Sequence, residues 1–238
     1  SGQEITISDI DNYETELEQK FVMVDQNKRK SLIHTELKKY LDDIDEDLLN
    51  EVTHLVEWPT LLNGSFDQKY LELPQEVLIA CMKKHQKYFP LLIDGTLQNQ
   101  FYVAADNVTK SNKNTIIQGN ETVLTARLED TAYFWDEDQK ISSQDRVEKL
   151  KKVVFQRGLG SIFDKKERLK QIASYLTTTL NKKENQNDCI NAVELCKSDL
   201  VSHMVYELPE LQGTMGRYYL EKEIKAGKSD CSNTVAQA

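Results

Sequence analysis

The sequence predicts an α+β protein, with a mixed sheet and helices in the first part of the chain and an all-helical second part. Two apolar segments, 88–93 and 101–105, flank Asp94-Gly95, a pair that favours a tight turn between strands. After residue 143, by contrast, apolar residues recur at helical spacing. The 238 residues are 39% hydrophobic and 29% charged, which is enough for one large or two modest domains with cores.

Capping residues and prolines mark the expected elements of the first part. Asp25 is a suitable N-cap, and Trp58-Pro59 ends a helix because the residue before proline is driven out of the α region. The expected elements are a helix after Ser8, a strand at 21–24, a helix after Asp25, a helix over 47–57, and a strand over 61–66 interrupted at Asn63-Gly64.

Two further helices are expected before the second part begins. Pro74 suits the first turn of one helix, whose apolar residues recur at helical spacing up to Cys81. Asn120 is expected to cap a long helix whose apolar stripe continues to Trp135. This long helix should bridge the two halves of the chain.

The second part should consist of helices separated by short loops. Residues 157–160 separate two of these helices, and Asp164 with Glu167 resembles a capping box at the start of the second one. A polar loop is expected at 181–188, and the last clear helix over 213–225.

The predicted domains are residues 1–142 and 143–238, in what we interpret as an excised fragment because the chain lacks an initial methionine. The four cysteines show no C-x-x-C spacing, so we expect them to be reduced, with Cys189 and Cys196 in a core. No run approaches the ~20 apolar residues of a membrane span, and the first residues lack a secretion-signal pattern. A soluble, cytoplasmic protein with no membrane partner is therefore expected.

Lysines and aromatic residues lie together in segment 82–90 of a chain whose formal net charge is -9. Ammonium groups neutralise phosphates and aromatic faces stack on bases, so this combination favours a nucleic-acid surface. A second basic segment, 145–170, carries nine Lys and Arg residues against four acidic residues. The alternative is a solvated helix end that runs into a half-buried strand. The predicted nucleic-acid-binding residues are Lys83, Lys84, Lys87, Tyr88, Phe89, Lys151, Lys152 and Arg157.

Catalytic signatures are weak in this sequence. Gly158-x-Gly160 lacks the third glycine and the preceding strand of a dinucleotide loop, and there is no phosphate-binding G-x-x-x-x-G-K-[ST] motif. We therefore assign no catalytic residue, metal ligand or ATP site. His203 is expected to be a packed or hydrogen-bonded helix residue, and Asp199 either pairs with a base such as Arg217 or is solvated.

Several segments carry a resemblance to a known family. They are Val56-Glu57-Trp58-Pro59, 73–90, 119–128, 151–156, Leu159-Gly160-Ser161, 196–200 and 210–219. Their collinear order resembles the β subunit of bacterial-type glycyl-tRNA synthetase, and the resemblance covers nearly all of the chain.

The resemblance implies an α2β2 enzyme in which the α subunit activates glycine with ATP and Mg²⁺, while the β subunit binds tRNA(Gly). This chain would be a fragment of the β subunit, with no cofactor and no catalytic site of its own. Residues 1–142 would be part of a domain similar to the B3/B4 region of phenylalanyl-tRNA synthetase. Residues 143–238 would be the beginning of a truncated HD-like domain.

Three alternatives stay open. In the first, the fragment is an assembly scaffold, and the acidic stretch 42–47 faces the α subunit or another part of β. The HD-like label invites a metal-dependent phosphohydrolase, which needs an adjacent His-Asp pair, and the sequence has no such dipeptide. The B3/B4 label invites an editing deacylase, but we match no editing residues onto this chain.

Overall fold

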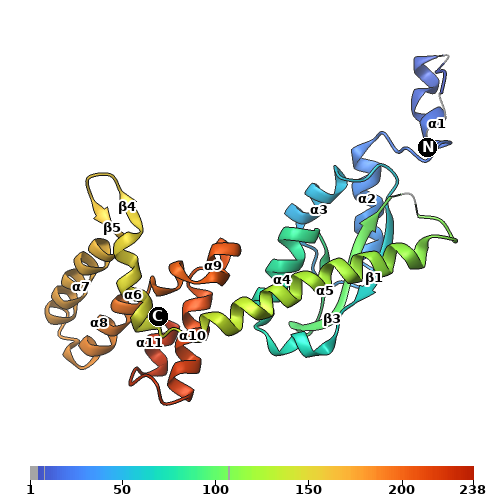
Figure 1. Cartoon of the computed structure of the whole chain (residues 1–238). Coiled ribbons are helices and arrows are strands. Elements are labelled where there is room, and N and C mark those ends of the chain that lie inside the picture. The colour runs from blue at the N-terminus through green and yellow to red at the C-terminus, as the bar shows by residue number, and fades with distance from the viewer. Residues whose placement is uncertain (1–4, 8, 107) are drawn as a thin grey trace. The chain divides into compact units, whose positions relative to one another are not determined.

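The computed structural model describes residues 5–7, 9–106 and 108–238, with the backbone alone described at Lys183. The chain divides into two compact units, Ser1–Glu129 and Asp130–Ala238. The division falls inside α5 (Lys113–Asp138), a single continuous helix (Figure 1). The domain boundary predicted between residues 142 and 143 lies after this helix and stays a prediction. Small antiparallel sheets combined with many helices confirm the predicted α+β class.

The first unit combines helices with a three-stranded antiparallel sheet in the order β1-β3-β2. Its strands are β1 (Thr60–Ser65), β2 (Phe89–Ile93) and β3 (Thr96–Ala105). Its helices are α1 (Tyr13–Glu18), α2 (Gln26–Leu37), α3 (Glu46–Thr53), α4 (Gln75–Cys81) and the first part of α5, with 3-10 turns at Ile10–Asn12 and Gln68–Glu72 and a π-helical turn at Met82–Gln86.

The hairpin between β2 and β3 forms at the predicted turn. Asp94 and Gly95 have φ angles of 49° and 76°, so both central residues adopt the left-handed region that a two-residue hairpin turn requires. Pairing of Ile93 with Thr96 closes the turn, so β3 begins earlier than the predicted residue 101. The register shifts between Pro90 and Leu92, where proline has no N–H to donate.

Gly64 lies inside β1 and does not interrupt the strand, contrary to the prediction. It pairs with Phe101 of β3, and a Cβ at residue 64 would lie 2.4 Å from Cζ of that ring. Glycine is therefore needed because the ring lies against the backbone, not because the strand ends.

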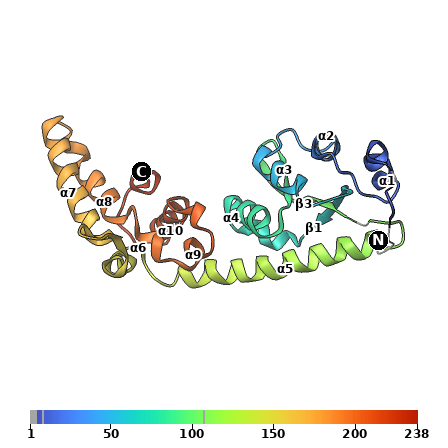
Figure 2. The same cartoon turned by 90° about the horizontal axis from the view of Figure 1, so that it is seen from above.

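Helices cover both faces of the sheet in the first unit. Figure 2 shows α2 and α3 on one side of β1 and β3, with α5 along the other. Glu121 of α5 accepts hydrogen bonds from the backbone N–H and the hydroxyl of Ser65, at 2.8 and 3.0 Å. The core on the α2 and α3 side consists of Ile33, Leu37, Leu41, Ile44, Leu48, Leu49, Val52, Val56, Phe89, Tyr102 and Ala104.

Two predicted features of the first unit are wrong. Residues 21–24 form no strand. Met23 N donates to Glu57 O, but the carbonyls of Met23 and Val24 accept from the Arg29 side chain, so no ladder forms. Asn120 lies in the interior of α5, which begins at Lys113, and its side chain donates to Ile116 O. The predicted cap at Asp25 is confirmed, since its carboxylate accepts from Asn27 N at 2.7 Å.

The second unit is helical apart from a small hairpin, which the prediction of an all-helical region missed. Its elements are the end of α5, α6 (Ser143–Lys149), β4 (Val154–Gln156), β5 (Gly160–Ser161), α7 (Ile162–Thr179), α8 (Gln186–Leu195), α9 (His203–Glu207), α10 (Thr214–Lys225) and α11 (Asn233–Gln237), with 3-10 turns at Leu150–Lys152, Lys183–Asn185, Ser198–Val201 and Pro209–Leu211.

The start of α7 and the cysteines also differ in detail from the predictions. The capping box pairs Ser161 with Asp164, whereas Glu167 forms an ion pair with Lys166. The four cysteines are free, as predicted, but Cys196 is exposed rather than packed in a core. It is the C-cap of α8, and the apolar stripe of that helix has ended one residue earlier.

Candidate nucleic-acid interface

The lysines of the first basic segment are engaged by acidic residues at α3. Lys83 Nζ lies 2.8 Å from Asp45 Oδ2, and Lys87 Nζ lies 2.8 Å from Glu51 Oε1. Asp45 also caps α3, and its hydrogen bond from Leu48 N, followed by its bond from Lys83, lowers the pKa of this carboxyl. These two ammonium groups therefore join the end of α4 to α3, and a phosphate would have to compete with carboxylates for them.

Tyr88 and Phe89 are buried in the first unit, with 2% and 1% of their surface exposed. The Tyr88 ring stacks on Phe101 at 4.4 Å, and its hydroxyl donates to Asn120 Oδ1 at 2.6 Å. Burial raises the pKa of Tyr88 to about 12, so the hydroxyl stays protonated at neutral pH. Neither ring offers a face to a nucleotide in this structure.

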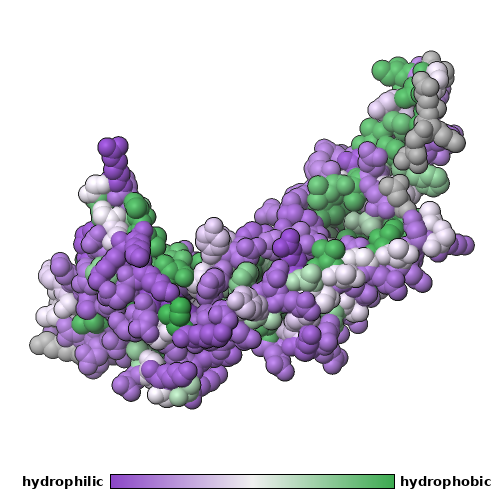
Figure 3. Space-filling model, viewed as in Figure 1, coloured by the Kyte–Doolittle hydropathy of each residue, from purple (hydrophilic) through white to green (hydrophobic). Residues whose placement is uncertain are grey.

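The second basic segment surrounds the hairpin of β4 and β5. The strands pair Val154 with Ser161 and Gln156 with Gly160, and Arg157 lies at the turn. The hairpin has a hydrophilic tip with hydrophobic side chains below it (Figure 3). Val154 of β4 is 75% exposed, so the hairpin presents apolar surface as well as charge.

The cations of this segment fall into three groups. Arg146 and Lys166 are buried, and Lys166 contacts Glu194 and Glu167. Lys151 pairs with Glu148 at 2.5 Å, and Lys170 with Glu194 at 2.9 Å. Within the described part of the chain, the remaining cations make no ion pair within 4 Å and are Lys149, Lys152, Arg157, Lys165 and Arg168.

Two of these unpaired cations, Lys165 and Arg168, lie on the first turns of α7 and were not among the predicted binding residues. Lys165 Nζ lies 4.1 Å from the centre of the Phe155 ring, which joins the helix to the hairpin. The signal for them in the sequence was the excess of basic over acidic residues in 145–170, nine against four, but their position beside the hairpin depends on tertiary structure.

Gly160 fixes the geometry that joins the hairpin to α7. Its φ is 82°, and a Cβ there would lie 2.3 Å from Asp164 Oδ2. That carboxylate accepts from Ser161 N at 2.7 Å and from the Ser161 hydroxyl at 2.8 Å. The hydrogen bond from Ser161 N lowers the pKa of Asp164. The motif Leu159-Gly160-Ser161 is thus explained by the tight turn from strand into capped helix.

An acidic groove of about 530 Å³ lies in the first unit between α4, β2 and the chain that precedes α3. Its rim carries carboxylates, and the pocket also includes Lys83, which pairs with Asp45. The rim residues are Asp42, Asp43, Asp45 and Asp94, and the floor is formed by Leu41, Ile79, Phe89, Pro90 and Leu92. Negative charge around an apolar floor suits a partner that carries both positive charge and aliphatic surface.

A buried carboxylate, Asp138, organises the second unit. It accepts from the backbone N–H and Nδ1 of His203, both at 2.9 Å, from Met204 N at 3.0 Å and from the Tyr219 hydroxyl at 2.8 Å. Burial and the nearby Asp138 raise the pKa of Tyr219. Arg146 donates to the Asp138 carbonyl and lies 4.3 Å from the centre of the Tyr219 ring. The prediction that His203 is hydrogen-bonded is confirmed.

A second buried carboxylate, Asp199, joins two segments of the same unit. It is 1% exposed and accepts from Gly213 N at 2.5 Å and Gly216 N at 3.1 Å at the start of α10. Its Oδ1 takes no hydrogen bond from the described residues. Burial raises the pKa of Asp199. Asp199 is thus a helix-capping carboxylate, and the solvated alternative is wrong.

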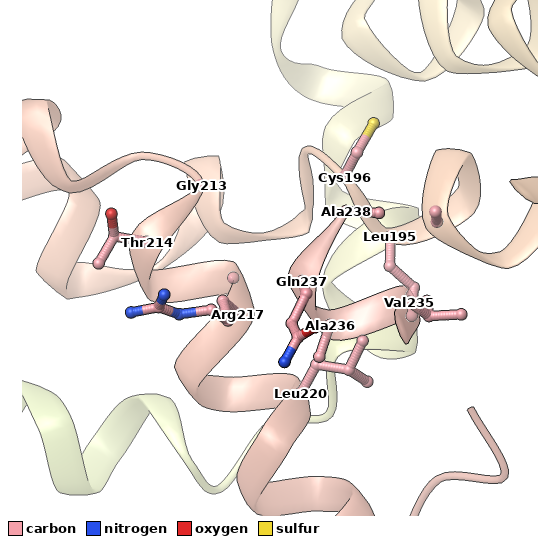
Figure 4. A pocket seen from close by; sticks show the side chains of 12 residues that line it. Leu195, Cys196, Gly213, Thr214, Arg217, Leu220, Val235, Ala236, Gln237 and Ala238 are labelled. Atoms are coloured by element: carbon pink, nitrogen blue, oxygen red, sulfur yellow. The ribbon is translucent and has the colours of Figure 1, made fainter. Parts of the chain in front are cut away.

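A cavity of about 280 Å³ lies in the second unit beside α8, α10 and α11 (Figure 4). Leu195, Leu220 and Val235 contribute apolar side chains, and Thr214 and Arg217 contribute polar ones. Among the residues that the structure describes, no three His, Cys, Asp or Glu side chains form a group that could hold a metal ion. No helix in the described ranges is long and apolar enough to cross a bilayer.

Comparison with known proteins gives the family. All of residues 1–238 match the family model described as "Glycyl-tRNA synthetase beta subunit". The chain belongs to this family.

Relatives named glycine–tRNA ligase beta subunit are similar over most of the chain. The one from Colwellia psychrerythraea is 43% identical over 222 residues, which is 90% of this chain and 32% of that protein. The one from Desulforamulus reducens is 42% identical over 227 residues, with 92% and 32% covered, and that from Clostridioides difficile is 42% identical over 221 residues, with 90% and 32% covered. The chain therefore spans about a third of the length of these relatives.

Two of the segments that resemble the family contact each other in the structure. Segment 196–200 contains Asp199, and segment 210–219 contains Gly213 and Gly216, whose N–H groups donate to that carboxylate. These two segments, distant in sequence, meet at a single buried cap. The segment Leu159-Gly160-Ser161 instead shapes the hairpin that presents Arg157.

Proposed function

We propose that this chain is part of the tRNA-binding β subunit of glycine–tRNA ligase, and that its β4–β5 hairpin and the first turns of α7 contact tRNA phosphates. The observation that carries the proposal is a group of cations without ion pairs in a chain whose formal net charge is -9. Lys152, Arg157 and Arg168 are exposed, and Lys165 is partly exposed. Such a concentration of unpaired positive charge attracts a polyanion. Membership in the glycyl-tRNA synthetase beta subunit family supports tRNA(Gly) as that polyanion.

In this proposal the chemistry belongs to an α subunit in an α2β2 assembly. The α subunit would use ATP and Mg²⁺ to activate glycine, and the present chain would supply binding and orientation of the tRNA. Binding energy from such remote contacts accelerates the reaction by holding the acceptor in position.

Salt dependence of binding tests the hairpin assignment. In the full-length assembly, Lys152→Ala with Arg157→Ala should lower the slope of log affinity for tRNA(Gly) against log salt by roughly 1–2, because each lost phosphate contact removes about 0.7–0.9. Lys151→Ala should change the slope less, since Lys151 is paired with Glu148 at 2.5 Å.

The matched control removes two charges from the same unit away from the hairpin. Lys225 and Lys228 are exposed, and the structure shows no ion pair for either within the described residues. Lys225→Ala with Lys228→Ala should leave the slope close to that of the wild type. Equal slopes for the hairpin variant and this control would argue against direct contact.

A second candidate function is assembly, and the acidic groove favours it. Asp42, Asp43 and Asp94 lie around an apolar floor, which suits a basic segment of the α subunit or of another part of β. Asp42→Asn with Asp43→Asn should then weaken co-purification with the α subunit and leave the salt slope for tRNA unchanged. Retained co-purification at the wild-type level would remove this candidate.

A further inference from the structure

A cavity of about 300 Å³ lies at the β1 edge of the sheet in the first unit, and neither candidate function above uses it. The end of α2 and the turn after it, two neighbouring strands and the first residue of α5 surround it. The lining residues are Glu36, Tyr40, Leu61, Asn63, Tyr102 and Lys113. Asn63 and Tyr102 are paired in the ladder of β1 and β3, so the two side chains lie next to each other on one face of the sheet.

The aromatic stack in this cavity differs from its neighbour in the core. Phe101 stacks on Tyr88 at 4.4 Å, and both rings are buried. The next residue, Tyr102, stacks on Tyr40 at 4.8 Å with 21° between the ring planes, but Tyr40 is 53% exposed. Both rings of the first stack are enclosed by the core, so neither can contact a ligand. In the second stack, the buried Tyr102 ring fixes the orientation of the Tyr40 ring, and much of the Tyr40 ring is open to solvent.

Polar groups of two kinds accompany the exposed ring. Asn63 Nδ2 donates to Phe101 O at 3.2 Å, which orients the amide, while its Oδ1 takes no bond from the described residues. Glu36 is neutralised by Lys39 at 2.5 Å. Lys113 is exposed and makes no ion pair within 4 Å in the part of the chain that the structure describes. The cavity thus combines an exposed ring, an oriented amide and an uncompensated cation.

We infer that this cavity binds one unstacked nucleotide of an RNA, with the base on Tyr40, a base edge at Asn63 and a phosphate at Lys113. The inference rests on the proposed function, because it names a second contact of the same RNA substrate. A ring held at a fixed angle stacks on any base, an amide can donate and accept at a base edge, and a free ammonium group binds phosphate. A nucleotide of a single strand uses all three groups at once, whereas an acidic small molecule would not need the open ring.

The test uses the full-length β subunit assembled with its α subunit and a fluorescent hexaadenylate, a single strand too short to fold. Loss of one base stack costs about 1–3 kcal/mol, so Tyr40→Ala should weaken hexaadenylate binding about five-fold to 150-fold. Tyr40→Phe keeps the ring and should bind within about two-fold of the wild type. Lys113→Ala should weaken binding and lower the salt slope by about 0.7.

Two controls separate binding from folding. Tyr175 on α7 is 68% exposed and lies outside the cavity, so Tyr175→Ala should leave hexaadenylate affinity unchanged. The thermal midpoint of each variant is measured alongside. If Tyr40→Ala lowers that midpoint strongly, the test uses the other two variants. Hexaadenylate should then bind to Tyr40→Phe as it binds to the wild type, and more weakly to Lys113→Ala. A hexanucleotide with one 4-thiouridine should crosslink to the peptide that contains Tyr40.

The outcomes distinguish this inference from the proposed function. If the hairpin variant loses tRNA affinity while Tyr40→Ala and Lys113→Ala bind hexaadenylate like the wild type, the cavity inference is overturned and the proposed function stands. If hexaadenylate responds to Tyr40→Ala but tRNA does not respond to the hairpin variant, the cavity stands and the hairpin assignment falls. No binding of hexaadenylate to the wild type also overturns the inference.

Discussion

The two units bury different chemistry. In the described residues of the first unit, Thr53 is the one buried polar side chain apart from tyrosines, and the core is mainly apolar. The second unit buries acids, bases and hydroxyls, which are Thr131, Asp138, Ser143, Arg146, Lys166, Thr177, Ser198, Asp199 and Ser202. Apolar burial is non-directional and tolerates change, whereas buried polar groups are costly unless each one is hydrogen-bonded. The second unit should therefore depend on a few side chains and on pH far more than the first.

Removal of the Asp138 carboxylate should have the largest effect. Asp138→Ala leaves the Met204 N–H and the Tyr219 hydroxyl buried without their acceptor, so we expect a loss of about 4 kcal/mol in the free energy of unfolding. Fluorescence of Trp135 in a Trp58→Phe background reports the second unit during urea unfolding. The exposed neighbour gives the control, since Asp136→Ala should change stability by less than about 0.5 kcal/mol. A loss below about 1 kcal/mol for Asp138→Ala would contradict the claim that the second unit depends on a few buried polar side chains.

Truncation of an apolar side chain should have the next largest effect, in the first unit. Leu49 is fully buried in the cluster of α2 and α3, so Leu49→Ala should cost about 3 kcal/mol through lost burial and a cavity. Trp58 fluorescence in a Trp135→Phe background reports this unit. Leu55 is 61% exposed, and Leu55→Ala should have little effect. The loss from Leu49→Ala should also be the same at pH 5 and pH 7, and a clear pH dependence would count against an apolar core.

Asp199 should make the second unit less stable as pH rises. Its folded pKa is raised by burial, so the folded state binds the proton more tightly than the unfolded state. Stability should therefore fall as pH increases from the ordinary carboxyl range through the raised pKa, and then level off. Asp199→Asn should remove this slope. The stability of the variant relative to the wild type should therefore increase as pH rises. Parallel curves from urea unfolding at a series of pH values would show that the carboxyl does not titrate in this way.

Surface ion pairs of the first unit should matter least. A double-mutant cycle of Lys87→Met and Glu51→Gln should give a coupling energy of about 0.2–1 kcal/mol, because both side chains are partly exposed. A coupling above about 2 kcal/mol would mean that polar contacts stabilise the first unit as strongly as the second. The same Lys87→Met variant should retain its affinity for tRNA if the pair only joins α4 to α3.

Local signals in the sequence predicted the elements that depend on neighbouring residues alone. Asp94-Gly95 specifies a turn through its own φ preferences, and Asp25 caps a helix two residues away. Residues 21–24 have strand-like composition, but a strand needs a partner, and none comes near enough to form a ladder. Asn120 has the right chemistry for a cap, yet a helix that is already formed from Lys113 uses it as an interior hydrogen-bond donor.

For the candidate site, the sequence showed where the basic residues are but not which carboxylates pair with them. It placed Lys83 and Lys87 in a basic segment, whereas their carboxylate partners come from residues more than thirty positions earlier. Asp138 ends the run Asp136-Glu137-Asp138, which reads as solvated charge because burial of its last member depends on helices that follow much later in the chain. Tyr40 gave no signal, since its stack on Tyr102 depends on how α2 packs on the sheet.

Among the residues that the structure describes, the order β1-β3-β2 leaves both outer strands of the small sheet without a strand partner on one side, and such edges invite strands of other molecules to join them. Both carry residues that oppose this. The outer strand β2 contains Pro90 next to a register shift, and β1 contains Asn63-Gly64. Proline interrupts the regular pairing of β2, and asparagine and glycine are poor strand-forming residues in β1, so neither edge is a long regular template for a foreign strand. Gly64, which makes room for the Phe101 ring, thus also makes the β1 edge a poor template for aggregation.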